Sequence, residues 1–596
     1  MSTNNAESSI DNDSIDNQTH RWWHHREFWL LVGMVALIYF TRLDAVSIRG
    51  EEPRRARIGI EMRETGDWIV PRQQGKPFLS RPPLQNWIIV GLGEIFGDVN
   101  AWAIRLPSVI SMLMIVTIIY AYSLSFLSRG GSFTAAIAFA SMPQVMELGR
   151  LGETEMLFTL LLAGSLFLWH LGYSRGWSAV KTWVIAYALI AMATLTKGPQ
   201  APVYFATSIG LFLLITRNWR FAISWAHLAG IVTFIVIWGA WQLPFMLKLG
   251  PAQSYAIYCN DVGLRFRETS WMITLTHMVE FPIEIFFACM LPWSILLFAY
   301  FNPRFLRAIG PQPRGYIIFL LCVIGVTFPT SWLVPNAHTR YFLPIYPFFA
   351  PLIGLVFDRC QAAQDSYRKT DKTRWWHRPW KIWWREWLVG TTLFMTTMGF
   401  VIFGISVFGD EDARFAQPLW FAITYLISTI ILSFVALKSR SITKGLRRLI
   451  GPASVAIFMG LTFVGVFTNS LIRTSGNTAE AVAAIKQQLP DDVQLVSLGY
   501  AHHLFAYHYR DYIPMIKVPH KGKIKPPKSE YFCFQNRSFK TARLGFKYEI
   551  IAEISYERTK IRDPNKIMTV ARKIKRTKGD QETPNTDGAR STRFKK

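Results

Sequence analysis

Long apolar runs alternate with short polar segments along most of the chain. A membrane-spanning helix needs about 20 consecutive, mostly apolar residues. About thirteen runs approach that length, namely 28–43, 103–127, 133–146, 156–172, 183–195, 202–215, 225–245, 283–301, 316–334, 342–357, 388–408, 419–437 and 450–467. The pattern therefore predicts an α-helical polytopic membrane protein. The shorter run 84–96 follows a proline pair, and we interpret it as an interfacial helix.

The polar segments divide the chain into further parts. Residues 1–27 form a polar tail that we predict to be cytoplasmic, and residues 28–472 form a transmembrane domain with a large polar loop at 44–102. Residues 473–559 combine an amphipathic helical pattern with strand-like runs, which predicts a small α/β domain on the outer face. Residues 560–596 are basic and poor in apolar residues, a composition typical of disorder.

Composition and charge narrow the class of protein. Hydrophobic residues make up 51% of the chain and the mean hydropathy is +0.20, unlike an ordinary soluble enzyme. The formal net charge is +26, but the basic residues are concentrated in short linkers such as 358–387 and in the C-terminal tail. That distribution is typical of cytoplasmic membrane loops and not of a nucleic-acid-binding surface. Five cysteines without paired spacing predict neither a disulfide framework nor a cysteine metal site.

The polar stretch 49–83 lies between two apolar runs and is the strongest candidate for a working surface. Pro53 suits the first turn of a helix and Gly66 suits its C-terminal cap, which predicts a helix over 53–65. Glu51 and Glu52 stand at its start. Two such carboxylates could simply complement the helix dipole, at about 0.3–1 kcal/mol each. Alternatively, one of them orients or deprotonates an acceptor while nearby arginines hold a phosphate.

Further ionisable residues fall on the same predicted side of the membrane. With a cytoplasmic N-terminus, the outer set comprises Glu51, Glu52, Arg54, Arg81, Glu153, Glu155, Lys197, Arg265, His277 and Arg340. Each could be an ordinary interfacial group, but their shared side favours one outer site. Such a site suits a polyprenyl-phosphate substrate, because transfer from it requires cations at the leaving phosphate and a carboxylate near the acceptor hydroxyl. His502, His503 and His508 are interpreted as surface or core residues.

Six ordered motifs resemble a family of membrane glycosyltransferases. They are EEPRRARIGIEMRETGDW, GKPFLSRPPLQNW, AIRLPSV, GRLGETEMLFT, LTKGP and RYFLPIYP, within about 49–347. The family includes the lipid A aminoarabinose transferases and the protein O-mannosyltransferases. The resemblance implies the GT-C fold, a polyprenyl-phosphate sugar donor, and a lipid A-like, glycan or protein acceptor. It also implies a multi-pass protein of the bacterial inner membrane whose active site faces the periplasm. The C-terminal domain is similar to that of the aminoarabinose branch.

The resemblance also implies roles for individual residues. Glu51, Glu52 and Glu155 would be catalytic, although Glu51 and Glu155 stand where the family usually has aspartate. The phosphate-binding set would be Arg54, Arg81, Lys197, Arg265, Arg340 and Tyr341. His277 resembles a metal-site histidine, but Ser80 stands where an acidic metal-site residue is usual. The resemblance thus requires no cofactor and leaves a divalent metal open.

A transporter or flippase of lipid-linked sugars is the alternative from another class. Such a protein should show repeated halves, with polar groups toward the bilayer midplane and both faces. The sequence has no convincing internal repeat, and its polar clusters favour one face. It also lacks a P-loop, which argues against an ATP-driven pump. We therefore expect an enzyme.

Overall fold

The computed structural model divides the chain into two compact units. It describes residues 22–265, 270–311, 313–335, 337–370, 379–410, 413–491, 493–519, 522–535, 542–556 and 566–574. The helical unit comprises residues 1–43, 79–88 and 102–470, and the mixed unit comprises 44–78, 89–101 and 471–596. Much of the polar loop therefore belongs to the same unit as the C-terminal segment. Most of the tail predicted to be disordered lies outside the described residues, but the prediction is wrong for Ile567–Lys573, which forms strand β9 of the C-terminal sheet.

The described part of the chain contains ten helical segments long and apolar enough to cross a membrane. They are Ala101–Ser123 (α5), Thr154–Ser174 (α8), Ala179–Lys197 (α9), Trp225–Leu249 (α11), Trp271–Cys289, Arg314–Trp332 (α15), Thr339–Gln364, Trp380–Phe408, Leu419–Ser439 (α18) and Leu446–Gln488. Three other predicted spans coincide with shorter helices, α2 (Arg26–Phe40), α6 (Arg129–Ala140) and α10 (Gln200–Ile215). The predicted α-helical polytopic class is confirmed.

One predicted span lies at a different place in the structure. The sequence indicated a span at 283–301. Instead, the segment before it contains α12 (Pro251–Arg265) and α13 (Trp271–Glu284), and the span-length segment is Trp271–Cys289. Glu280 and Glu284 interrupt the apolar run, but the segment as a whole is still apolar enough to cross a membrane. The run 84–96 forms the short helix α4 (Leu84–Phe96).

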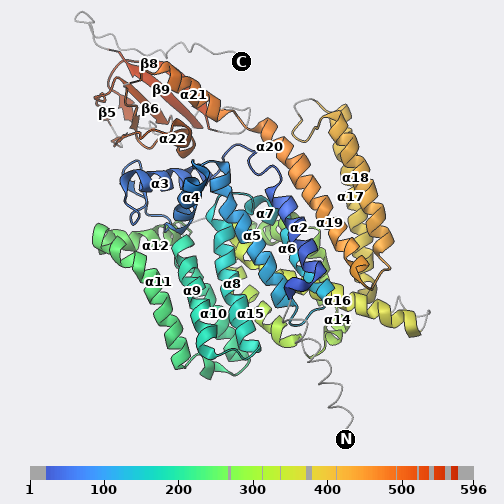
Figure 1. Ribbon diagram of the computed structural model, residues 1–596. Coiled ribbons are helices and arrows are strands. Elements are labelled where there is room, and N and C mark those ends of the chain that lie inside the picture. The colour runs from blue at the N-terminus through green and yellow to red at the C-terminus, as the bar shows by residue number, and fades with distance from the viewer. Residues whose placement is uncertain are drawn as a thin grey trace, which may run out of the picture. The chain divides into compact units, whose positions relative to one another are not determined.

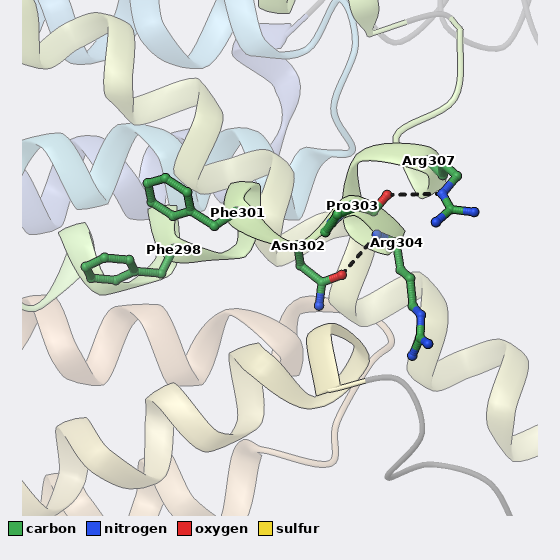
Figure 2. A pocket seen from close by; sticks show the side chains of 6 residues that line it. All are labelled: Phe298, Phe301, Asn302, Pro303, Arg304 and Arg307. Carbon is green, nitrogen blue, oxygen red and sulfur yellow. Dashed lines mark hydrogen bonds between the residues drawn. The ribbon is translucent and has the colours of Figure 1, made fainter.

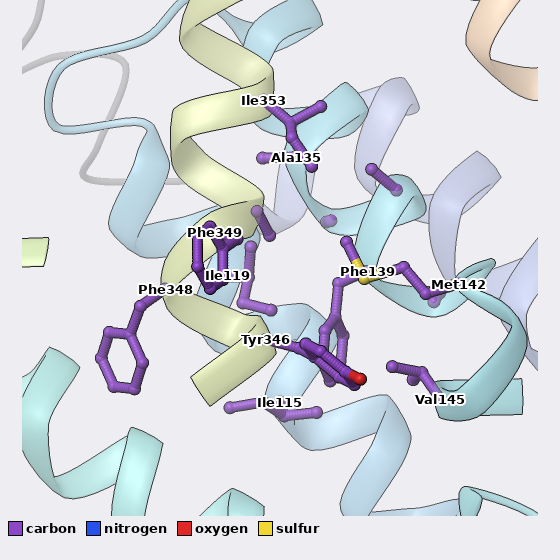
Figure 3. Close-up of a cluster of buried hydrophobic side chains, with 14 of the residues drawn as sticks. Ile115, Ile119, Ala135, Phe139, Met142, Val145, Tyr346, Phe348, Phe349 and Ile353 are labelled. Carbon is purple, nitrogen blue, oxygen red and sulfur yellow. The ribbon is translucent and has the colours of Figure 1, made fainter. Parts of the chain in front are cut away.

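The core of the helical unit is built where α5, α6 and α16 (Tyr346–Thr370) meet. Figure 3 shows Ile115 and Ile119 of α5 beside Phe139 of α6 and Phe349 of α16. A polar contact fixes the other end of this packing, because the buried Asp358 carboxylate accepts hydrogen bonds from the backbone N–H and hydroxyl of Ser128, both at 2.6 Å. In the same unit, α17 (Trp383–Phe408) and α18 run side by side (Figure 1).

The mixed unit contains a five-stranded sheet in the order β4-β3-β6-β9-β8. Figure 1 labels β6, β8 and β9 of this sheet. Its strands are β3 (Val496–Leu498), β4 (Met515–Ile516), β6 (Tyr531–Gln535), β8 (Tyr548–Ser555) and β9 (Ile567–Lys573). Strand β3 is parallel to β4 and β6, whereas β9 is antiparallel to β6 and β8. Apolar side chains of α21 (Thr478–Gln488) and α22 (His503–Tyr509) share a core with strands β6 and β9. The predicted α/β domain is therefore present.

The loop part of the mixed unit folds around α3 (Glu52–Thr65). Pro53 occupies the first turn and Gly66 caps the helix with a positive φ of 68°, as the sequence predicted. A two-stranded hairpin follows, formed by β1 (Arg72–Gln73) and β2 (Lys76–Pro77). Helix α3 packs against both β1 and α22. These contacts place the two glutamates at the start of α3 next to the C-terminal segment.

Candidate functional site

Two ion pairs, one buried and one partly exposed, lie at one end of α8 in the helical unit. The Lys197 Nζ atom at the end of α9 is 3.2 Å from Oε1 of Glu155, and the side chains are 2% and 5% exposed. Arg340 Nη1 is 3.1 Å from Oε2 of Glu153, which stands at the N-cap of α8. Burying a charge is costly unless it is paired. The packing of α8, α9 and η5 (Thr339–Ile345) therefore determines where these charges lie.

The ring of Tyr341 connects the two pairs. Lys197 Nζ lies 5.0 Å from the Tyr341 ring centroid, and the Arg340 guanidinium carbon lies 5.6 Å from the same centroid. Both separations are within the range of cation–π attraction. The buried Arg340 Nε has no hydrogen-bond partner among the described residues. A buried N–H donor in this position could bind an anionic ligand.

Arg81 adds a third cation to this charged group. It is 8% exposed, donates to the Ser80 carbonyl at 3.0 Å and acts electrostatically on Glu155. The three cations Arg81, Lys197 and Arg340 and the two carboxylates Glu153 and Glu155 together carry a net charge of one positive unit. We call this set the helical-unit charge cluster, and its members are Arg81, Glu153, Glu155, Lys197, Arg340 and Tyr341. An excess of positive charge around guanidinium and ammonium donors suits a phosphate.

A second cluster lies at the start of α3 in the mixed unit. Arg54 Nη1 donates to Glu51 Oε2 at 2.6 Å, and Arg54 Nη2 is 3.3 Å from Nδ1 of His503. The other ring nitrogen, Nε2, is 3.0 Å from the Gly50 carbonyl oxygen. A carbonyl only accepts, so Nε2 carries the proton and Nδ1 accepts from Arg54. These bonds define a neutral His503 with a single tautomer.

The two glutamates at the start of α3 differ in their surroundings. The Glu51 side chain is 28% exposed, so an acceptor can reach its carboxylate. Glu52 is completely buried, and its Oε2 accepts a hydrogen bond from the Arg49 backbone N–H at 2.9 Å. The structure therefore distinguishes an accessible carboxylate from one that orders the loop backbone.

Two predicted residues belong to neither cluster as described. Arg265 is the last residue of α12, and its side chain lies outside the described residues. His277 lies on α13 with Nε2 3.2 Å from the Ser331 carbonyl oxygen, and its ring is 4.9 Å from that of Phe281. Within the described ranges, no group of three or more His, Cys, Asp or Glu residues could hold a metal ion. A metal role for His277 therefore has no support from its described neighbours.

The chain is similar to several known proteins. Residues 80–241 match the family model for dolichyl-phosphate-mannose-protein mannosyltransferase. The crystal structure of ArnT from Cupriavidus metallidurans bound to undecaprenyl phosphate is similar, with a TM-score of 0.63 and 17% identity over 92% of this chain and 98% of that one. The chain has the fold of that structure, a GT-C fold. The predicted fold and resemblance are confirmed.

Sequence relatives of this GT-C protein include two curated arabinosyl transferases. One is the undecaprenyl phosphate-alpha-4-amino-4-deoxy-L-arabinose arabinosyl transferase of Serratia proteamaculans, 25% identical over 56% of this chain and 60% of that protein. Another is the arabinosyl transferase 2 of the same name from Proteus mirabilis, which is 28% identical over 51% of this chain and 54% of that protein. The chain thus aligns with little more than half the length of these relatives. The family-model match includes Arg81, Glu155 and Lys197, whereas Glu51 and Arg340 lie outside it.

Sequence reasoning missed several residues that hold the loop of this GT-C protein. Glu61 accepts from the backbone N–H groups of Gln74 and Gly75, at 2.9 and 2.6 Å. The Gln74 amide donates to the Ser497 hydroxyl and the Ile513 carbonyl, both at 3.0 Å, and its oxygen accepts from the Ala501 N–H at 3.0 Å. No local pattern could identify Gln74, because the partners of its side-chain amide are more than 400 positions away.

A pocket in another part of the helical unit is unrelated to these clusters. It has a volume of about 480 Å³ and is lined by Phe298, Phe301, Asn302, Pro303, Arg304 and Arg307. Figure 2 shows both arginines on α14 (Pro303–Ala308), with the Arg304 N–H donating to Asn302 and Arg307 Nε donating to the Pro303 carbonyl. No carboxylate is among the residues that line this pocket.

Proposed function

We propose that the protein is an inverting membrane glycosyltransferase that moves a sugar from a polyprenyl phosphate to an acceptor hydroxyl. The site would face the periplasm of a bacterial inner membrane, and the acceptor would be a lipid A-like molecule, a glycan or a protein. The names of the curated relatives and of the matching family model support this proposal, because both describe sugars carried on polyprenyl-type phosphates.

The helical-unit charge cluster is the observation that carries the proposal. When the sugar departs, the bond from its anomeric carbon to the phosphate oxygen breaks and the oxygen keeps the electron pair. The phosphate then gains negative charge, which preorganised cations stabilise most in the transition state. Lys197 and Arg340 lie beside one tyrosine ring, and Arg340 has a buried Nε donor without a partner among the described residues. We assign phosphate binding to Arg81, Lys197 and Arg340.

Glu51 would act on the acceptor. In the proposed reaction, the acceptor oxygen bonds to the anomeric carbon with inversion, and its proton passes to the Glu51 carboxylate. A general base must be within hydrogen-bond reach of the proton that it takes, and the partial exposure of Glu51 allows that approach. The buried Glu52 would order the loop, and Glu155 would hold Lys197 in place.

The test begins by finding the sugar and the acceptor. Mass spectrometry of envelope lipids and glycoproteins from a deletion strain should reveal one missing modification, and the wild-type gene should restore it. A Glu51→Gln variant should be present in the membrane at normal abundance without restoring the modification. Glu94→Gln is the matched control, since Glu94 is an exposed glutamate in the same unit, paired with Arg63 at 3.0 Å.

Two outcomes would overturn the proposal. Full restoration by Glu51→Gln would remove Glu51 from the reaction. With the purified protein in liposomes and a radiolabelled polyprenyl-phosphate sugar, the label should move to the acceptor. Label that crosses the bilayer with its bond to phosphate intact would instead identify a transporter.

A further inference from the structure

We propose that His503 is a positioning residue for the Glu51 carboxylate, which makes α22 of the C-terminal α/β domain a part of the catalytic apparatus. This inference rests on the proposed function of Glu51. His503 and Arg54 are 449 positions apart in the chain, yet their side chains are in contact. The C-terminal domain would therefore do more than cover the loop.

His503 contacts the loop on both sides of Glu51. Its Nε2–H donates to the carbonyl of Gly50, immediately before Glu51, and its Nδ1 accepts from Arg54, three residues after Glu51. The guanidinium of Arg54 is planar and rigid, so fixing Nη2 also fixes the direction of Nη1. That Nη1 atom is the donor to Glu51 Oε2 at 2.6 Å. The orientation of the His503 imidazole thus determines the orientation of the Glu51 carboxylate through Arg54.

The imidazole is itself held by neighbouring rings. The His502 ring centroid lies 4.1 Å from that of His503, and His502 stacks on Tyr556 at 3.9 Å with an interplanar angle of 9°. His502 also accepts a hydrogen bond from the Leu504 N–H through Nδ1 at 3.3 Å, which caps α22. Phe505 anchors the helix in the core of the domain. His503 therefore projects from a well-supported helix start.

The rest of α3 is held by separate contacts to the same domain. Arg57 Nη1 donates to the Arg510 carbonyl oxygen at 2.7 Å, and Glu61 binds the turn at Gln74 and Gly75. The Gln74 amide then joins that turn to Ser497 and to the backbone at 501 and 513. These contacts keep α3 docked when His503 is changed, so loss of His503 should misorient Glu51 without releasing the helix.

Three variants of the full-length protein test this positioning role. His503→Ala removes both bonds, and His503→Asn keeps an oxygen near the place of Nδ1. His508→Ala is the matched control on the same helix. Because small misplacements of reacting groups slow a reaction strongly, His503→Ala should lower kcat by roughly ten- to a hundredfold with little change in KM for the donor. His503→Asn should recover most of the loss, and His508→Ala should match the wild type.

Hydrogen exchange provides a second readout that does not depend on activity. In His503→Ala, backbone amides at 50–56 should exchange faster than in His508→Ala, while amides at 57–65 stay protected. Equal protection at 50–56 in these two variants would overturn the inference, as would an unchanged kcat in His503→Ala. If Glu51→Gln proves active, the proposed function fails, and the exchange result then decides separately whether His503 orders the loop.

Discussion

Nζ of Lys197 lies 3.2 Å from Oε1 of Glu155, and both side chains are almost completely buried. The contact joins the end of α9 to the first turn of α8. Lys197 Nζ also lies 5.4 Å from the Phe158 ring centroid and 5.0 Å from that of Tyr341. The buried Lys197 ammonium is therefore compensated by the Glu155 carboxylate and lies beside two aromatic rings.

Lys197→Met should destabilise the protein by about 3–5 kcal/mol, because it leaves the Glu155 carboxylate buried without its cation. The double variant Lys197→Met with Glu155→Leu should recover most of that stability, since an apolar pair replaces the ion pair. Neither variant should transfer sugar. Thermal unfolding in detergent, with a transfer assay alongside, measures both. A double variant that regained transfer would show that the pair is only structural.

Arg340→Gln should lower kcat/KM for the polyprenyl-phosphate donor by about 10²–10³-fold, the usual effect of removing one donor that stabilises transition-state charge. The matched control is Arg304→Gln with Arg307→Gln, in the pocket of Figure 2. Both arginines of that control lie outside the helical-unit charge cluster, so its kcat/KM should equal that of the wild type. A similar loss in both proteins would indicate a general effect of surface charge.

Gly75→Ala should loosen the β1–β2 turn. Gly75 has a positive φ of 75°, and a Cβ there would lie 2.7 Å from the Tyr512 hydroxyl oxygen. The left-handed conformation alone costs a side chain about 1–2 kcal/mol. The double variant Gly75→Ala with Tyr512→Phe should recover the stability lost to the steric contact with the hydroxyl. It should still carry the cost of the left-handed backbone conformation. Chemical denaturation of the wild type and of these two variants measures both contributions, and an unchanged midpoint in Gly75→Ala would contradict the described turn.

The stability of the mixed unit should fall in acid partly through His508. Burial, aided by the Arg510 charge, lowers the pKa of His508 to about 4 from its usual 6.5. A depressed pKa means that the unfolded chain binds the proton first, so the contribution of neutral His508 is present above pH 6.5 and is lost as the pH falls through about 4. His508→Gln should flatten this part of the stability profile, measured by thermal unfolding from pH 4 to pH 7. An unchanged slope would exclude His508 as a cause.

Membrane sidedness should separate the candidate site from the basic linkers. Glu51→Cys and Arg340→Cys should react with an impermeant maleimide added to the periplasmic side of spheroplasts. Arg304→Cys, on the basic helix α14, should react only after the membrane is permeabilised, because basic linkers are typical of cytoplasmic membrane loops. The native cysteine Cys259 is exposed and should be replaced first. Labelling of Glu51→Cys and Arg340→Cys from opposite sides would contradict the outer site.

The helices were predictable because a membrane helix satisfies its own backbone hydrogen bonds, so a local apolar run is enough to specify it. The start and end of α3 were equally local, set by Pro53 and Gly66. The exception was Trp271–Cys289, where Glu280 and Glu284 interrupt a segment that is still apolar enough as a whole to cross a membrane.

By itself, the sequence determined the membrane class, the helix α3 and the set of ionisable residues from which a site could be drawn. Only the tertiary structure decided which of them pair, because Lys197 and Glu155 are 42 positions apart, Arg340 and Glu153 are 187, and Arg54 and His503 are 449. The sequence around a charged residue does not indicate which distant residue will pair with it. Packing alone brings two distant side chains to hydrogen-bonding distance and excludes the water that would otherwise solvate each of them.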